Sequence, residues 1–339
     1  MTTMKAVQVP SAGGPFQLVE RPLPEPGAGQ VRLKVQACGV CHSDSMVKEG
    51  GTIPIAYPRV PGHEVIGTID SLGPGVRPWM VGQRVGIGWH GGHCFICLPC
   101  RRGDFLHCEH EQVTGLSFDG GYAEYMLAPQ EALERVPDSL AAAEAAPLVC
   151  AGVTTFNALR HSPARPGDLV AVQGLGGLGH LGIQFAGRCG LKTVAVSRGR
   201  DKEQLARQLG ADEYIDSATS DPARELLRMG GAHVVLATAP SGPAIGGLIE
   251  GLRPNGQLLV VAAPHDATSL MLASLISTTR SIQGWASGTA VDSEDTLNFS
   301  VLRQIRPLIE TFPLQRAQEA YERMMTNRVR FRAVLLPHD

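Results

Sequence analysis

The chain has 339 residues, of which 43% are hydrophobic and 18% charged. A chain of this length exceeds what one hydrophobic core usually holds, so two domains are expected. The formal net charge of -2 and the lack of a basic block argue against nucleic acid or an anionic membrane as partner.

The N-terminus and the cysteine content predict a cytoplasmic protein. Residues 1–10 lack the charged and then apolar pattern of a signal peptide, and no uninterrupted apolar run is long enough to span a bilayer. In such a chain the eight cysteines are expected to bind metal rather than form disulfides.

Residues 5–147 show short strand patterns separated by Pro and Gly clusters. Strands are predicted at 4–9, 30–37 and 64–70. This pattern indicates a small, mostly β domain.

Residues 39–44, Gly-Val-Cys-His-Ser-Asp, place a thiol, an imidazole, a hydroxyl and a carboxylate behind a glycine. Such a group is typical of a metal site, and His63 and Cys150 are candidate partners of Cys41. Two sulfurs and one imidazole suit zinc, and three protein ligands leave the fourth tetrahedral position open, as in catalytic sites. The alternative is two buried thiols and a core imidazole.

Four further cysteines fall within fifteen residues. Thiolates at this spacing can turn onto one ion and leave no vacant position, which predicts a structural zinc site. An iron–sulfur cluster and a redox dithiol are the alternatives. The neighbouring His93, His107 and His110 are expected to be solvated. The four cysteines are Cys94, Cys97, Cys100 and Cys108.

Beyond Cys150 strands and helices alternate. A buried strand at 168–173 ends in Gly-Leu-Gly-Gly-Leu-Gly at 174–179, and a helix is predicted at 180–189. Between a strand and a helix, this G-x-G-x-x-G turn predicts a pyrophosphate site at the helix N-terminus, the alternative being a tight packing turn. Further strands are expected at 192–197, 213–215, 233–238, 257–261 and 281–285, with a helix at 201–209. The pattern predicts a doubly wound parallel sheet of the Rossmann type.

From about residue 287 the alternation stops. Helices are predicted at 292–304 and 314–325, and a strand at 332–336 is expected to return to the first domain. The predicted domains are therefore 1–149 with 288–339, and 150–287.

These motifs together resemble the zinc-dependent medium-chain alcohol dehydrogenase family, over essentially the whole chain. The resemblance implies a GroES-like catalytic domain, with a zinc lobe at about 90–110, beside a Rossmann domain. It implies reversible hydride transfer between a small alcohol or aldehyde and a nicotinamide cofactor, in a dimer or tetramer. The motifs are residues 39–44, Gly-His-Glu at 62–64, the four-cysteine lobe, Cys-Ala-Gly-Val-Thr at 150–154 and the glycine turn.

The resemblance also implies residue roles around two zinc ions. Cys41, His63 and Cys150 would hold the catalytic ion, with Glu64 close by, and the four-cysteine lobe would hold the structural one. Ser43 would receive the alcohol proton. Asp44 would orient the imidazole of His63, and Trp89 would line the substrate pocket.

The cofactor contacts that the resemblance implies come from both domains. His42 and Arg332 would face the pyrophosphate with the glycine turn, Thr154 and residues 261–263 the nicotinamide, and Lys202 the ribose. The full set is His42, Thr154, Gly174, Gly176, Gly177, Leu178, Gly179, Ser197, Arg198, Lys202, Val261, Ala262, Ala263 and Arg332.

Two positions depart from the typical family pattern. Met46 stands where many members carry a histidine that passes the proton to solvent, so the path from Ser43 is expected to end in ordered water. Ser197 stands where members that prefer NAD carry an acidic residue. With Arg198 beside it, Ser197 favours NADP; the alternative is that Arg198 and Arg200 are solvated loop charges.

Two other functions share parts of this pattern. A catalytically silent, zinc-stabilised nucleotide-binding protein would lose the ligands Cys41, His63 or Cys150, which are all present. A zinc-free quinone or enone reductase of the same fold would lack the four-cysteine lobe as well. The sequence therefore favours an alcohol dehydrogenase.

Overall fold

The computed structural model describes residues 2–51, 53–264 and 266–339. The chain folds as two compact units, one made of Met1–Val153 with Gly288–Asp339 and the other of Thr154–Ser287. The sequence-based boundary lies just before Cys150. The structure keeps Cys150 in the same unit as Cys41 and His63.

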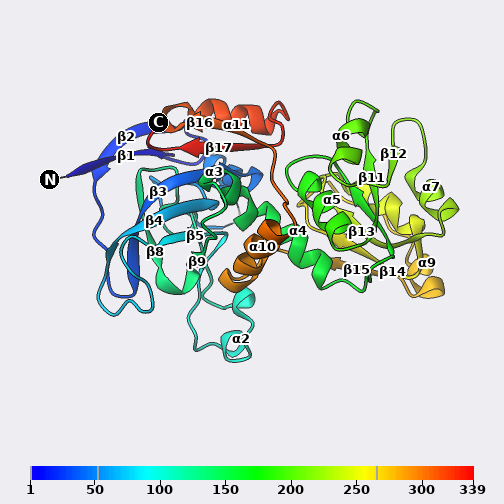
Figure 1. The fold of residues 1–339 in the computed structure, drawn as a ribbon, viewed down its shortest axis with the longest axis horizontal. Coiled ribbons are helices and arrows are strands. Elements are labelled where there is room, and N and C mark those ends of the chain that lie inside the picture. The colour runs from blue at the N-terminus through cyan, green and yellow to red at the C-terminus, as the bar shows by residue number, and fades with distance from the viewer. Residues whose placement is uncertain (1, 52, 265) are drawn as a thin grey trace. The chain divides into compact units, whose positions relative to one another are not determined.

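The first unit is built on a mixed, mostly antiparallel sheet in the order β16-β17-β3-β4-β5-β9, with β8 also paired to β3. Strand β17, red in Figure 1, lies antiparallel beside β3, in blue, so the C-terminal segment returns to this unit as predicted. The strands are β1 Thr3–Gln8, β2 Gln17–Pro22, β3 Gln30–Val40, β4 Val65–Leu72, β5 Arg84–Ile87, β6 His90–Gly92, β7 Gln112–Val113, β8 Tyr125–Pro129, β9 Glu134–Arg135, β16 Ile309–Pro313 and β17 Arg332–Leu336.

Strand β3 is the centre of this sheet and ends at the candidate metal site. Its alternating Val31, Leu33 and Val35 are fully buried, as expected for a strand with one face on a core. Cys41 follows its last residue directly. The helices of the unit are η1 His42–Asp44, α1 Ser45–Lys48, α2 Leu98–Arg101, η2 Phe105–His107, η3 Gln130–Ala132, α3 Ala142–Ala145, η4 Ala146–Val149, α10 Ala290–Leu302, η6 Leu314–Arg316 and α11 Ala317–Met325.

The second unit contains a parallel sheet in the order β12-β11-β10-β13-β14-β15. Counted along the chain this is the order 3-2-1-4-5-6 of a Rossmann sheet, so the predicted fold class is confirmed. Its strands are β10 Leu169–Gln173, β11 Lys192–Ser197, β12 Glu213–Asp216, β13 Ala232–Ala237, β14 Leu252–Val260 and β15 Ser281–Gly284. Its helices are α5 Gly179–Arg188, α6 Glu203–Gln208, α7 Pro222–Arg228, α8 Gly242–Gly246, η5 Gly247–Gly251 and α9 Leu272–Thr278, while α4 Ala151–Arg160 runs across the boundary between the units.

Two predicted elements differ from the structure by three or more positions at their first residue. The helix predicted at 314–325 begins as the 3₁₀ helix η6 and becomes α-helical only at Ala317. Strand β14 begins at Leu252 rather than 257, because Leu252 pairs with Ala232 before an irregularity around Asn255, whose φ is 62°.

No single helix among the described residues is both long enough and apolar enough to cross a membrane. One bent pair, Ala142–Val149 with Ala151–Arg160, meets that test by length and composition.

Candidate functional site

Four metal-binding side chains meet where β3 ends. The ligand atoms of Cys41, His63, Glu64 and Cys150 all lie within 4.8 Å of one another. The Sγ atoms of Cys41 and Cys150 are 3.9 Å apart. Two sulfurs on one tetrahedral zinc ion are about 3.8 Å apart, given Zn–S bonds of about 2.3 Å. The donor set and its spacing therefore fit zinc.

The imidazole of His63 has one nitrogen facing a carboxylate and one without a partner. Its Nδ1 lies 3.2 Å from Asp44 Oδ1, and both side chains are buried. Its Nε2 is buried and has no hydrogen-bond partner among the described residues. An unpaired buried nitrogen is costly. A metal ion bound at Nε2 would remove that cost.

The two thiols of this cluster differ in acidity. A hydrogen bond with Cys150 holds the thiol pKa of Cys41 well below its usual value, and the charge of His63 adds to this effect. The same contact, together with burial, raises the thiol pKa of Cys150. The cluster thus favours a thiolate at Cys41, the form of cysteine that binds metals.

A buried ion pair lies beside the cluster. Arg332 Nη2 bonds to Glu64 Oε1, with the two side chains 6% and 0% exposed. Burial raises the pKa of Glu64 to about 7, although the charge of Arg332 opposes the rise. A Cβ at position 39 would lie 1.9 Å from Glu64 Oε2, so the glycine there is required. Arg332, expected to face a pyrophosphate, therefore has one nitrogen committed to Glu64.

The other residues expected near substrate lie around η1 and β5. His42 is exposed and Ser43 is partly buried on η1. The ring of Trp89 meets that of His63 edge-on, with centroids 5.0 Å apart. Met46 and Trp89 both pack on an apolar cluster, so this side of the metal site is apolar. The buried members of that cluster are Val9, Val47, Val113 and Leu116.

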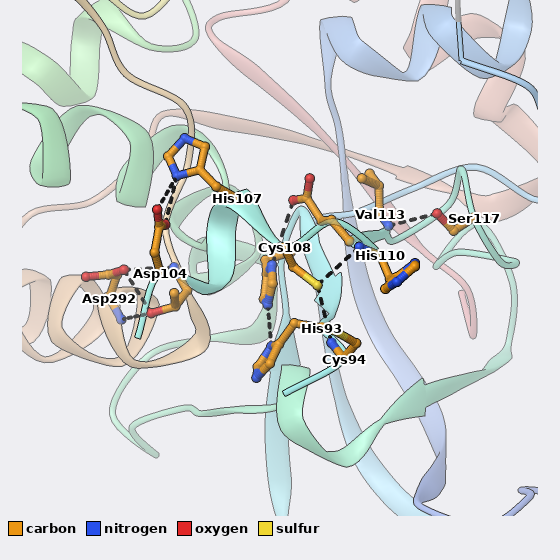
Figure 2. A network of polar contacts seen from close by, with 12 residues as sticks. His93, Cys94, Asp104, His107, Cys108, His110, Val113, Ser117 and Asp292 are labelled. Atoms are coloured by element: carbon orange, nitrogen blue, oxygen red, sulfur yellow. Dashed lines mark hydrogen bonds and ion pairs between the residues drawn. The ribbon is translucent and has the colours of Figure 1, made fainter. Parts of the chain in front are cut away.

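The second cysteine cluster gathers four sulfur atoms within 4.8 Å of one another. Cys97 Sγ is 3.8 Å from Cys108 Sγ, which matches the sulfur spacing on zinc. Figure 2 shows the backbone N–H groups of Cys94 and His110 donating to Cys108 Sγ, each at 3.3 Å. Bonds from the backbone of Cys97 and Ile96 lower the pKa of Cys94 to about 6. The lobe therefore fits a closed, structural zinc site.

Of the three histidines expected to be solvated in this lobe, two are exposed and one is not. His107 is exposed and pairs with Asp104 at 2.7 Å (Figure 2), and His110 is exposed as well. His93 is not a solvated residue. Its Nδ1 lies 2.9 Å from His90 Nε2, and its ring stacks on Phe105 with centroids 4.1 Å apart. The prediction for His93 was wrong because the rings of His90, Phe95 and Phe105 pack against it.

The glycine turn between β10 and α5 has three different constraints. Gly174 has a φ of +93°, and a Cβ at Gly179 would lie 1.8 Å from the Gly174 carbonyl oxygen. A Cβ at Gly176 would meet no atom within 4 Å. Protein packing therefore explains the first and last glycines but not Gly176. An approaching pyrophosphate would explain it, since the backbone must be bare there.

The remaining predicted cofactor residues lie at the carboxyl ends of the parallel strands. Gly177 and Leu178 complete the glycine turn, Ser197 ends β11, and residues 261–263 follow β14. Lys202 Nζ donates to the Leu175 carbonyl oxygen at 3.4 Å, which joins the first two of these loops. Ligands bind at this edge in open α/β sheets. Thr154 is buried on α4, at the first residue of this unit.

Tyr122 belongs to the site although no sequence motif includes it. Its hydroxyl donates to Asp44 Oδ2 at 2.8 Å, and the side chain is fully buried. The two residues are 78 positions apart, so no local pattern connects them.

Comparison with known proteins identifies the family of the chain. Residues 27–138 match the alcohol dehydrogenase GroES-like domain, and residues 177–301 match the zinc-binding dehydrogenase domain. The chain is 45% identical to the alcohol dehydrogenase notN of an Aspergillus species, with 98% of both chains covered. It is 37% identical to an alcohol dehydrogenase of Geobacillus stearothermophilus, over 98% of this chain and 99% of that one.

A solved structure shares the whole fold. Acetophenone reductase from Geotrichum candidum, in complex with NAD, is 29% identical, with a TM-score of 0.86 and coverage of 98% of this chain and 97% of that one. The matched domains, the full-length relatives and the two cysteine clusters lead to one conclusion. The chain belongs to the zinc-dependent medium-chain dehydrogenase/reductase family and is an alcohol dehydrogenase.

Proposed function

We propose that Cys41, His63 and Cys150 hold a catalytic zinc ion and that the protein interconverts small alcohols and aldehydes with a nicotinamide cofactor. The unpartnered Nε2 of His63 beside two sulfurs 3.9 Å apart carries this proposal. Zinc bound there supplies Lewis acidity toward the substrate oxygen. The three side chains fix its position, and Glu64, paired with Arg332, stays beside it.

The alcohol proton is received by Ser43 in this proposal. Its hydroxyl can accept one proton and donate another, and it is partly accessible on η1. Met46 cannot carry a proton, and it packs on the apolar cluster beside Trp89. The proton must therefore leave from Ser43 through ordered water.

The cofactor is proposed to be NADP in preference to NAD. Ser197 ends β11 without the carboxylate that would repel a 2′-phosphate. Arg198 is exposed and has no ion-pair partner among the described residues, so its guanidinium is available for a bidentate contact.

A second, structural zinc ion is proposed for the four-cysteine lobe. The four thiols are free and converge on one point with N–H donors to their sulfurs. Such a closed site contributes to folding rather than to chemistry.

We propose that the enzyme assembles into a dimer or tetramer. Strand β15 is the edge of the parallel sheet and exposes Ile282 at 39%, and α9, which precedes it in the chain, exposes Leu272 at 66% and Ile276 at 82%. An exposed strand edge beside apolar side chains favours pairing with another chain. Light scattering on the purified protein tests the assembly.

A substrate panel tests the activity. Purified enzyme is given primary and secondary alcohols, aldehydes and ketones with NADP(H) or NAD(H), and nicotinamide absorbance is followed. The proposal expects alcohol oxidation and aldehyde reduction with a higher kcat/KM for NADP(H). Reduction of quinones or enones without alcohol oxidation would instead indicate the reductase alternative.

A further inference from the structure

Both backbone polar groups of Gly199 are held by side chains from the neighbouring strand. The N–H of Gly199 donates to Asp216 Oδ1 at 2.7 Å, and the hydroxyl of Tyr214 donates to the Gly199 carbonyl oxygen at 2.5 Å. Gly199 has a φ of +78°, a conformation that other residues adopt only with strain. The loop after β11 is therefore fixed at its middle residue.

Asp216 is itself fixed at the end of β12. Its Oδ1 also accepts the N–H of Ala218 at 2.9 Å, and its Oδ2 accepts the hydroxyl of Thr219 at 3.1 Å. The residue is 8% exposed, and these bonds, that of Ala218 foremost, lower the pKa of its carboxyl. Asp216 is thus an ionised, oriented acceptor for the loop.

The fixed glycine separates two exposed arginines. Arg198 has no ion-pair partner among the described residues, and Arg200 has only a loose one, its Nη1 lying 3.8 Å from Glu203 Oε2. Cations on an unconstrained loop would sample many positions. Because both the N–H and the carbonyl oxygen of Gly199 are bonded, the backbone positions of the adjacent Arg198 and Arg200 are restricted.

This loop lies next to the glycine turn. The N–H of Gly174 donates to the Val196 carbonyl oxygen at 2.9 Å, and Lys202 Nζ reaches the Leu175 carbonyl oxygen. A dinucleotide with its pyrophosphate on the glycine turn would therefore bring its adenosine ribose toward the loop after β11.

We propose that Tyr214 and Asp216 are positioning residues for cofactor selection, which hold the loop so that Arg198 pairs with the 2′-phosphate of NADP(H). The inference rests on the proposed nicotinamide cofactor and adds two residues that do not touch it. A bidentate arginine–phosphate contact needs a fixed geometry. Ordering the loop before binding lowers the entropy that the contact must overcome.

Cofactor binding to the zinc-loaded enzyme tests the proposal. Dissociation constants for NADPH and NADH are measured by fluorescence titration for wild type, Tyr214→Phe, Arg198→Ala and the double variant. Tyr214→Phe is expected to weaken NADPH binding by roughly three- to tenfold, the value of one hydrogen bond, and NADH binding by less than about twofold. In the Arg198→Ala background Tyr214→Phe should change neither constant, because the loop then has no phosphate contact to position.

Two variants test the role of Asp216, one that keeps its hydrogen-bond acceptor and one that removes it. Asp216→Asn can keep both backbone bonds through Oδ1 and should keep the NADPH preference, whereas Asp216→Ala should lose it. Tyr125→Phe, at a tyrosine of the other unit, is the matched control and should alter neither constant.

Hydrogen exchange of the cofactor-free protein gives a second readout. Tyr214→Phe and Asp216→Ala should speed exchange in the peptide covering 197–202, while Asp216→Asn and Tyr125→Phe should not. Unchanged exchange, or a Tyr214→Phe effect that persists in full after Arg198→Ala, overturns the inference. A wild type that binds neither dinucleotide contradicts the proposed function instead.

Discussion

Asp44 Oδ1 lies 3.2 Å from His63 Nδ1, and the two side chains are 1% and 0% exposed. The other carboxylate oxygen, Oδ2, accepts the N–H of Cys41 and the hydroxyl of Tyr122, both at 2.8 Å. Asp44 therefore connects two metal ligands, Cys41 through its backbone and His63 through its ring. These contacts orient both ligands toward the same point.

Replacing Asp44 by asparagine should weaken zinc binding at this site. The amide oxygen can keep both bonds that Oδ2 accepts, but the amide carries no charge to support the imidazole of His63. Loss of such a partner typically lowers metal affinity or activity by about 10–100-fold. Chelator competition and kcat/KM measure both effects, and unchanged zinc retention would contradict the assigned role.

The matched variant Tyr122→Phe removes one bond to Oδ2 and leaves Asp44 charged. It should cost about 1 kcal/mol of stability and much less zinc affinity than Asp44→Asn. Equal losses of zinc in the two variants would show that the hydrogen bonds that orient Asp44, and not its charge, determine the zinc affinity.

Replacing Ser43 by alanine should remove most alcohol oxidation. Loss of a proton-transfer partner typically lowers the rate by about a hundredfold or more. Met46→His should add a group that can carry a proton and raise the oxidation rate at neutral pH, provided that proton transfer limits turnover. A Ser43→Ala enzyme that oxidises alcohol at the parental rate would rule out this route.

Glu134 should make stability depend on pH. The side chain is 2% exposed, and burial raises its pKa well above the usual value of 4.5 despite bonds from Ser293 and Gly88. The folded state keeps this proton at pH values where the unfolded state loses it. The contribution of Glu134 to the free energy of unfolding is therefore fully present below about pH 4.5. This contribution is lost as pH rises toward the pKa of Glu134 in the folded state, by up to about 1.4 kcal/mol per pH unit.

Chemical denaturation at several pH values tests whether the contribution of Glu134 to stability falls as pH rises. The free energy of unfolding of wild type should fall relative to that of Glu134→Gln between pH 5 and 8. Glu20→Gln, at an exposed glutamate of the same unit, should run parallel to wild type. A constant difference between wild type and Glu134→Gln would mean that Glu134 is ionised in the fold.

Cys97→Ser should reduce stability before it affects chemistry, because Cys97 belongs to the closed lobe. The thermal midpoint should fall together with one zinc ion per chain, while enzyme that remains folded keeps its kcat. Cys189→Ser, outside both clusters, is the control. A lower kcat with an unchanged midpoint would reverse the assignment.

Local patterns predicted the metal clusters and the parallel sheet. Cys41 and Asp44 stand three residues apart, and strands of the second unit are buried runs rich in Val, Leu and Ala, such as Leu169–Gln173. Strands β6 and β7 were not predicted, because runs of 3 and 2 residues show no periodicity.

Contacts between distant residues could not be predicted. Tyr122 reaches Asp44 across 78 positions and Arg332 reaches Glu64 across 268. Such pairs are brought together by strand order, as when β17 adds to β3. The sequence shows that Glu64 and Arg332 are charged, but only the fold shows that they neutralise each other.

Zinc content and alcohol oxidation of Cys41→Ser test the central claim most directly. A serine hydroxyl is a much weaker zinc ligand than a thiolate. Elemental analysis should give two zinc ions per chain for wild type and one for Cys41→Ser, with the circular dichroism spectrum retained and alcohol-dependent cofactor reduction abolished. Two zinc ions in the variant, or turnover with only one, would contradict a catalytic zinc ion at Cys41, His63 and Cys150.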